Sequence, residues 1–207
     1  MTDLDSRSLG VGHLAAVAFN PSWDRAGESA VEHLRRHAAG DGWLALAEYT
    51  YDARCLLGTA LTDGQLDLLW CSCTRGNHRP GWDGVPGREW IRTVRDVTAE
   101  RADPAYLARL IDAGQHPELA GRILRAAGQF HALDRFSLCE VPDDQARTAL
   151  AEVVRAGYPD VALRLLLRMV QAHLMPLSAG LFDELADLAR RTGLDEDIVP
   201  GLAFLVG

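Results

Sequence analysis

The sequence predicts an all-α protein built from stacked antiparallel helix pairs. Apolar residues recur at helical spacing along most of the 207 residues, and glycines that can end a helix alternate with residues that can start one. Segment 90–98, which has the length of a strand, carries its apolar residues on one helical face instead. With 48% hydrophobic residues, the chain can bury the core of one domain or of two small ones.

Residues 1–18 are predicted to form a loose N-terminal arm, because the first dozen are polar and rich in glycine. Regular structure is expected to start near residue 19, and residues 19–73 are interpreted as an N-terminal helical region. Its first helix is predicted over about 21–39. Asn-Pro-Ser-Trp supplies a capping residue and a first-turn proline at its start, and Gly-Asp-Gly at 40–42 ends it.

Two further helices are predicted in this region. One covers the apolar run 43–57 and stops at Gly58. The other opens at Thr62, which forms a capping box with Gln65, and continues through Cys73.

Residues 74–87 interrupt the helical pattern with four glycines and two prolines, so an irregular loop is predicted. Long ordered loops in compact domains are often functional, and arginine, histidine and tryptophan are typical of anion sites and binding hot spots. The candidate ligand- or partner-binding residues are Arg75, His78, Arg79, Trp82, Arg88 and Trp90. In the alternative interpretation, the tryptophans close one end of the helical stack and the arginines pair with nearby acids.

Residues 88–207 are predicted to form a helical-repeat region. Leu-Ala-Arg-Leu-Ile-Asp-Ala-Gly at 107–114 is echoed by Leu-Ala-Glu-Val-Val-Arg-Ala-Gly at 150–157, with a weaker copy at 185–193. In each copy a helix ends at a glycine, and a proline or an acidic residue starts another helix a few residues later. Each copy therefore predicts a helical hairpin.

Two-helix units of this length bury their apolar faces only by stacking. In this pattern the chain resembles the HEAT and armadillo repeat proteins, over roughly residues 100–207 and less completely from residue 20. The resemblance implies a short α-solenoid that forms one continuous domain over 19–207. Because no repeat consensus is matched and the spacings vary, an irregular helical bundle is the alternative.

The helix expected at 159–173 is apolar nearly all round, which predicts a central strut packed on several sides. Its narrow polar stripe consists of Asp160, Arg164, Arg168 and Gln171.

The net charge of −8 argues against nucleic acids and anionic membranes as partners, because both require neutralising cations on the protein. The charge is uneven, since residues 75–95 carry five arginines against two acids and residues 183–197 carry six acids against two arginines. A basic protein partner is compatible with this balance.

The longest strongly apolar segment, 161–175, is interrupted by two arginines and a glutamine, so no membrane span is expected. The first residues carry acids where a secretory signal would carry bases, which predicts a cytoplasmic location. All basic residues are arginine, a bias typical of GC-rich bacterial genomes.

The chain has four cysteines, Cys55, Cys71, Cys73 and Cys139. They are expected to be reduced or buried thiols, because this number and spacing do not make a disulfide framework. Cys71, Cys73 and His78 are spaced too closely for a usual structural zinc site. His33 and His37 lie one helical turn apart, but arginines separate them and the glutamate of a zincin motif is missing. The sequence therefore predicts no metal site and no cofactor.

No nucleophile elbow, phosphate-binding loop or dinucleotide motif occurs, so no catalytic residue is assigned. The leading hypothesis is a non-catalytic protein-interaction module, of the adaptor or immunity type, that binds a protein partner through its helical-repeat surface or its loop. The alternative is an enzyme, or a small-ligand or anion-binding protein, with its site in 74–95. That alternative predicts a concave pocket in which His78, Arg79, Trp82 and Arg88 converge.

Overall fold

A computed structural model describes residues 9–23, 27–113, 116–132, 141–194 and 198–207. The predicted all-α class is confirmed, because the described residues contain helices and a single isolated β-bridge, between Leu177 and Val206, but no strand. The α-helices are α1 (Gly10–Ala18), α2 (Ala30–Gly40), α3 (Trp43–Leu57), α4 (Asp63–Cys73), α5 (Gly87–Ala99), α6 (Pro104–Ala113), α7 (Ala120–Ala127), α8 (Asp143–Arg155), α9 (Pro159–Ala172) and α10 (Ala179–Arg191). Short 3₁₀ turns lie at Pro80–Asp83, Pro117–Leu119 and Pro200–Leu205.

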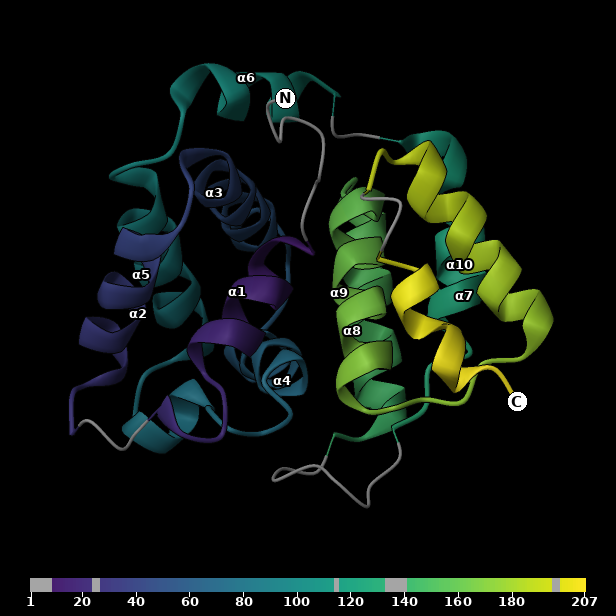
Figure 1. Cartoon of the computed structure of the whole chain (residues 1–207), viewed down its shortest axis with the longest axis horizontal. Coiled ribbons are helices and arrows are strands. Elements are labelled where there is room, and N and C mark those ends of the chain that lie inside the picture. The colour runs from purple at the N-terminus through teal and green to yellow at the C-terminus, as the bar shows by residue number, and fades with distance from the viewer. Residues whose placement is uncertain (1–8, 24–26, 114–115, 133–140, 195–197) are drawn as a thin grey trace.

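The helices form two halves that meet along a central seam (Figure 1). The N-terminal half contains α1 to α6 and the C-terminal half contains α7 to α10. At the seam, α1 packs against α9, and α4 packs against both α8 and α9. One cluster of buried apolar side chains extends through both halves, so the seam is part of a shared core.

Helix α1 corrects the prediction of a loose arm over residues 1–18. Residues 10–18 form a helix that packs against α3, α4 and α9, with Leu14 and Ala15 fully buried. Small residues allow this close approach, since a Cβ at Gly12 would lie 3.1 Å from the side chain of Arg168. The glycines that suggested flexibility are therefore packing residues. The first part of the predicted arm lies outside the described residues.

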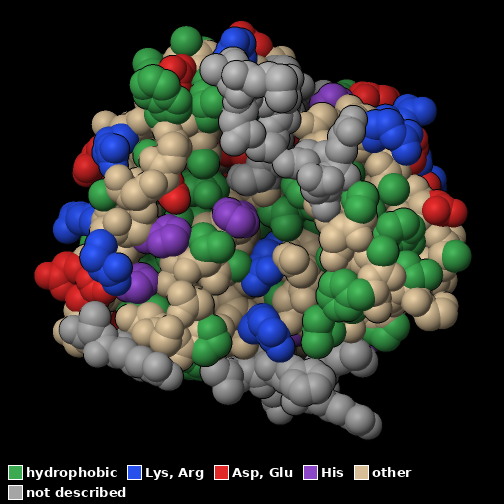
Figure 2. Space-filling view, viewed as in Figure 1, with side chains coloured by type: hydrophobic (Ala, Val, Ile, Leu, Met, Phe, Trp, Pro, Cys, Tyr) green, Lys and Arg blue, Asp and Glu red, His purple; other side chains and the backbone are tan. Residues whose placement is uncertain are grey.

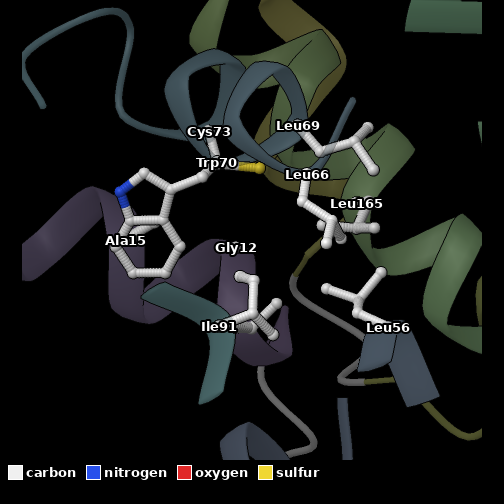
Figure 3. A pocket seen from close by; sticks show the side chains of 10 residues that line it. Gly12, Ala15, Leu56, Leu66, Leu69, Trp70, Cys73, Ile91 and Leu165 are labelled. Atoms are coloured by element: carbon white, nitrogen blue, oxygen red, sulfur yellow. The ribbon is translucent and has the colours of Figure 1, made fainter. Parts of the chain in front are cut away.

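A small apolar cavity of about 10 Å³ lies where α1 meets α3, α4, α5 and α9 (Figure 3). Its labelled lining residues include Gly12 and Ala15 from α1 and Cys73 and Trp70 from α4. The cavity has almost no polar surface, so it has no partners to hold an ordered water. Its position shows that α1 is part of the centre of the core.

The first predicted helix begins later than expected. Ser29 caps α2, and its side chain forms a capping box with Glu32, so the helix starts at residue 30 and not near 21. The predictions for the next two helices are confirmed. Helix α3 covers the predicted range, and Thr62 caps α4 through the predicted capping box with Gln65.

The helical hairpins of the C-terminal region are formed only in part. Helices α8 and α9 pack as a pair, and Gly157 between them adopts the left-handed conformation at φ +95°. Helix α6 packs instead on α3, whereas α7 packs on α8, α9 and α10. The two helices of the first predicted hairpin thus belong to different halves, and the stack is irregular.

The prediction of a central strut at 159–173 is confirmed by α9, which is buried along nearly its whole length. Along the described part of the chain, no helix combines the length and the apolar character needed to span a membrane.

Candidate functional site

The loop at 74–87 is fixed to α4 by one buried carboxylate. Asp67 accepts hydrogen bonds from Nε of Arg79 and, at 2.9 Å, from the backbone N–H of Gly81. The turn that follows closes with Gly84 in the left-handed conformation, at φ +72°. The loop therefore contains a short 3₁₀ turn held in one position, where the sequence predicted only irregular structure.

His78 lies inside the protein, only 1% exposed. The indole N–H of Trp70 donates to Nδ1 of His78 at 2.9 Å, which leaves the proton of the neutral ring on Nε2, 3.2 Å from Oδ2 of Asp83. Burial lowers the pKa of His78 to about 4, although the bond to Asp83 opposes the shift. The ring is therefore neutral near pH 7 and acts as a hydrogen-bonded core residue.

An aromatic cluster surrounds this histidine. The ring of Phe19 stacks on His78 with 4.2 Å between centroids, and Trp90 lies 4.8 Å away. Trp23 and Trp70 contact the same rings edge-on. Edge-to-face and offset packing of this kind stabilises a core beyond its area burial. His78 and Trp90 thus lie in a buried aromatic cluster of the core.

The predicted arginines also make internal contacts. The guanidinium of Arg88 donates to the carbonyl of Leu57, the last residue of α3, and to the carbonyls of Thr59 and Leu61 just after it. Arg79 is paired with the buried Asp67. Both side chains therefore hold elements together, and neither directs its donors toward a shared site.

Two of the six predicted residues remain directed outward or unpaired. Trp82 is 58% exposed at the tip of the anchored turn. Arg75 is half-buried, has a backbone φ of +58°, and forms no ion pair with any described carboxylate. None of His78, Arg79, Trp82 and Arg88 lines the apolar cavity beside α1 or the open cavity between α1 and α2.

An open cavity of about 540 Å³ lies instead between α1 and α2. Its lining residues are Val17, Ala18, Asn20, Ser22, Trp23, His33, Arg36 and His37. Most of its strong polar groups are already engaged, since His33 bonds to Glu28 and to the carbonyl of Ala18, and Arg36 pairs with Glu28. This cavity was not predicted from the sequence, because one of its walls is α1, which was expected to be unstructured.

The weak metal patterns of the sequence do not assemble. The two ring nitrogens of His33 are both hydrogen-bonded, and within the described ranges no three metal-ligating side chains gather in a way that could hold an ion. Cys55 and Cys73 are free and buried, as expected, but Cys71 is disulfide-bonded, which corrects the expectation of reduced thiols there. Burial raises the pKa of Cys73 to about 12. Cys139 lies outside the described residues.

The least expected polar feature is a buried ionic cluster at the seam. Arg164 of α9 pairs with Asp52 of α3 and, at 3.1 Å, with Asp160. Asp52 also accepts the backbone N–H of Val11 at the start of α1, at 3.0 Å. The signal in the sequence was the spacing of Asp160 and Arg164, four residues apart in the narrow polar stripe of a largely apolar helix.

No protein-family model, curated protein sequence or solved structure matches this chain. Its function must therefore be argued from its own residues.

Proposed function

We propose that this chain is a non-catalytic protein-interaction module that binds a protein partner through a surface centred on Trp82. One observation carries the proposal: a tryptophan that is 58% exposed stands on a turn fixed at several points. Its own backbone N–H donates to the carbonyl of Arg79 at 2.9 Å, and the neighbouring Gly81 is bonded to Asp67.

A fixed aromatic anchor supports binding for two reasons. Burial of an indole in a partner's pocket removes a large apolar area from water, and tryptophan is enriched at binding hot spots. Because the turn is already ordered, less conformational entropy is lost when the partner binds. Arg79 and Asp83 flank Trp82 in the sequence and are partly exposed, which supplies polar groups for the rim of the surface.

The charge of the chain favours a basic partner. The net charge of −8 repels other acidic proteins and increases the rate of encounter with basic ones. An adaptor or immunity-type protein with an irregular helical-repeat architecture fits this combination of charge and exposed anchor.

The test compares three proteins as affinity baits in a lysate of the source organism: wild type, Trp82→Ala and Trp43→Ala. Trp43 is the matched control, because it is 68% exposed and lies at the start of α3. We expect a basic protein that the wild type and Trp43→Ala retain and Trp82→Ala loses. With the purified pair, the loss should be about 2 kcal/mol of binding free energy or more.

The proposal fails if no protein distinguishes Trp82→Ala from the other two baits. Trp82→Ala should leave the free energy of unfolding within about 0.5 kcal/mol of the wild type, because the side chain is exposed. A larger loss of stability would show that the indole has a structural role.

The alternative function, an enzyme or small-ligand protein with its site in 74–95, has weaker support. It required four converging side chains, but His78 is buried among aromatic rings, and Arg79 and Arg88 are bonded to α4 and to the end of α3.

A further inference from the structure

The open cavity between α1 and α2 has the size of a small-molecule site. Its volume of about 540 Å³ lies within the range of ligand pockets, which is roughly 300–1,000 Å³. Figure 2 shows histidine side chains gathered over α1 and α2, the two helices that form its walls. Helix α2 presents His33, Arg36 and His37 to the cavity, whereas Asn20 and Ser22 on the opposite wall are bonded to each other. The cavity thus has a charged side on α2 and a less polar side at the end of α1.

The apolar part of the cavity wall is fixed in position. The indole N–H of Trp23 donates to the carbonyl of Asn77 at 2.8 Å, and the indole ring packs edge-on against the rings of Phe19 and His33. Val17 adds an exposed aliphatic surface at the end of α1. A wall that is already ordered favours the apolar body of a ligand, because it loses little conformational entropy on binding.

His33 is held between two groups that require opposite protonation states. Its ring is buried, and Nε2 lies 2.6 Å from the carbonyl of Ala18. Because a carbonyl only accepts, Nε2 carries a proton in the neutral ring as well as in the charged ring. Nδ1 lies 2.9 Å from Oε1 of Glu28 and 2.8 Å from Nη2 of Arg36. A neutral ring accepts from the guanidinium but repels the carboxylate, and a protonated ring donates to the carboxylate but repels the guanidinium.

Arg36 is the partner that can leave the ring. Bonds from Arg36 and then from His33 hold the pKa of Glu28 well below its usual value, so this carboxylate stays ionised over the range in which histidine titrates. The side chain of Arg36 is 61% exposed, whereas that of Glu28 is 18% exposed. The guanidinium is therefore able to turn toward the cavity while the carboxylate remains beside the ring.

The other elements around His33 bring no charge to its ring. Within the described ranges, no further charged side chain is bonded to it, including those of α5. His78 of the loop packs with it against Phe19 and is neutral near pH 7. His13 of α1 interacts with Asp41, beyond the end of α2. Protonation of the ring thus adds one positive charge to an ion pair that is already balanced.

We infer that this cavity binds a small carboxylic acid as its anion, and that His33 takes up one proton when the anion binds. The bound carboxylate attracts Arg36 away from the ring, and the protonated ring donates from Nδ1 to Glu28. Two ion pairs then replace one, every contact has the favourable sign, and the net charge of the site does not change. A single added charge matches a monoanion, and Trp23 matches an apolar body.

This site goes beyond the proposed partner surface and does not depend on it. The test is calorimetric titration of the full chain at pH 5.5 and at pH 8 with benzoate, which has an anionic head and an apolar ring. Benzamide, the uncharged analogue, is the control ligand. We expect saturable binding of benzoate that is about tenfold or more tighter at pH 5.5, the size of a typical coupling between two binding events.

The proton can be followed directly at pH 7. Titration in buffers of different ionisation enthalpy should show proton uptake when benzoate binds, because proton and anion binding are reciprocally linked. In nuclear magnetic resonance, the Nδ1 resonance of His33 should move toward its protonated position as benzoate is added. Both measurements use the wild-type protein.

Four variants assign the roles of the side chains. Arg36→Gln should weaken benzoate binding at pH 5.5 about tenfold or more, because a charge-assisted contact is lost. Arg35→Gln removes the same charge from an exposed residue that does not line the cavity, and it should bind as the wild type does. His33→Gln should bind benzoate equally at both pH values, since glutamine does not titrate. His37→Gln, one helical turn further along the same wall, should retain the pH dependence.

Benzoate that does not bind at pH 5.5, or that binds equally at pH 5.5 and pH 8, would overturn the inference, as would benzamide bound as tightly as benzoate. A pH dependence that is lost in His37→Gln and kept in His33→Gln would also contradict it. If His33→Gln does not fold, the Nδ1 resonance of the wild type decides, because an unprotonated Nδ1 in the complex excludes the mechanism. Loss of the partner in the Trp82 experiment leaves these outcomes unchanged, so the two proposals fail separately.

Discussion

At the scale of single residues, the fold depends on one buried arginine. Arg164 is surrounded by Asp52 and Asp160, and its pKa is raised well above the usual value, because attraction to the two carboxylates outweighs the cost of burial. Burial raises the pKa of Asp52, and its bonds to Arg164 and Val11 oppose that shift. Removal of one member of such a cluster leaves buried charge without compensation, which costs more than the intact cluster contributes.

We therefore expect Arg164→Met to lower the free energy of unfolding by about 3–5 kcal/mol, measured by urea denaturation at pH 7. The matched control is Arg191→Met, which removes an exposed ion pair with Asp187 and should cost less than about 1 kcal/mol. An equal loss of unfolding free energy in the two variants would mean that the buried ionic cluster contributes no more to stability than an exposed ion pair.

His78 makes the stability depend on pH. Its folded-state pKa is about 4 and the ordinary value is 6.5, so between these values the unfolded chain binds a proton that the folded protein does not. Stability should thus fall as the pH decreases from about 6.5 to about 4, by up to about 3 kcal/mol from this residue.

The measurement is the free energy of unfolding of the wild type and of His78→Gln at pH 7 and at pH 4.5. Glutamine can still accept the indole N–H of Trp70 but cannot titrate. Asp83, Asp67 and His33 also act on the ring, and both proteins retain them, so they largely cancel in the comparison. The same loss of stability in the two proteins would exclude His78 as its source.

At the scale of elements, α1 is inserted among other helices and tolerates few changes. Gly10 has a φ of +55°, and a Cβ there would lie 1.7 Å from Oδ2 of Asp52. Its neighbour Val11 donates a backbone hydrogen bond to the same carboxylate. A side chain at residue 10 therefore has to displace either the start of α1 or the buried ionic cluster.

Gly10→Ala should lower the free energy of unfolding by more than about 1 kcal/mol. The added Cβ strains the backbone at a positive φ and displaces the buried carboxylate of Asp52. Gly64→Ala is the control on α4, where nothing lies within 4 Å of the added Cβ, and it should stabilise the protein by about 0.4–1 kcal/mol. Opposite signs in urea denaturation confirm this placement of α1, and a harmless Gly10→Ala contradicts it.

At the scale of the whole molecule, the two halves share one core across the seam. α1 and α4 of the first half contact α9 of the second, and the buried ionic cluster also crosses between α3 and α9. This arrangement predicts that neither half unfolds alone.

The five tryptophans allow a direct test, because all of them lie between residues 23 and 90, in the N-terminal half. Tryptophan fluorescence thus follows that half, whereas far-UV circular dichroism follows helices in both. We expect the two urea transitions to have the same midpoint. Separate midpoints would show that the halves unfold independently.

Local patterns identified much of this architecture. The all-α class, helices α3 and α4 with their glycine and capping-box boundaries, the buried α9 and the hairpin at Gly157 were all predicted, because each depends on neighbours in the sequence. The loop was recognised as distinctive, but the exposure of its residues was not. Trp82 and Trp90 are alike in type, and only their packing places one in solvent and the other in the core.

The sequence by itself determined where most helices form and which faces are apolar, since helix signals act over a few residues. Only the tertiary structure decided that the glycine-rich start is a central helix, that α6 and α7 separate, and that Arg164 finds Asp52 more than a hundred positions away. Contacts of this kind depend on how apolar faces combine around a core, and no local window contains that information.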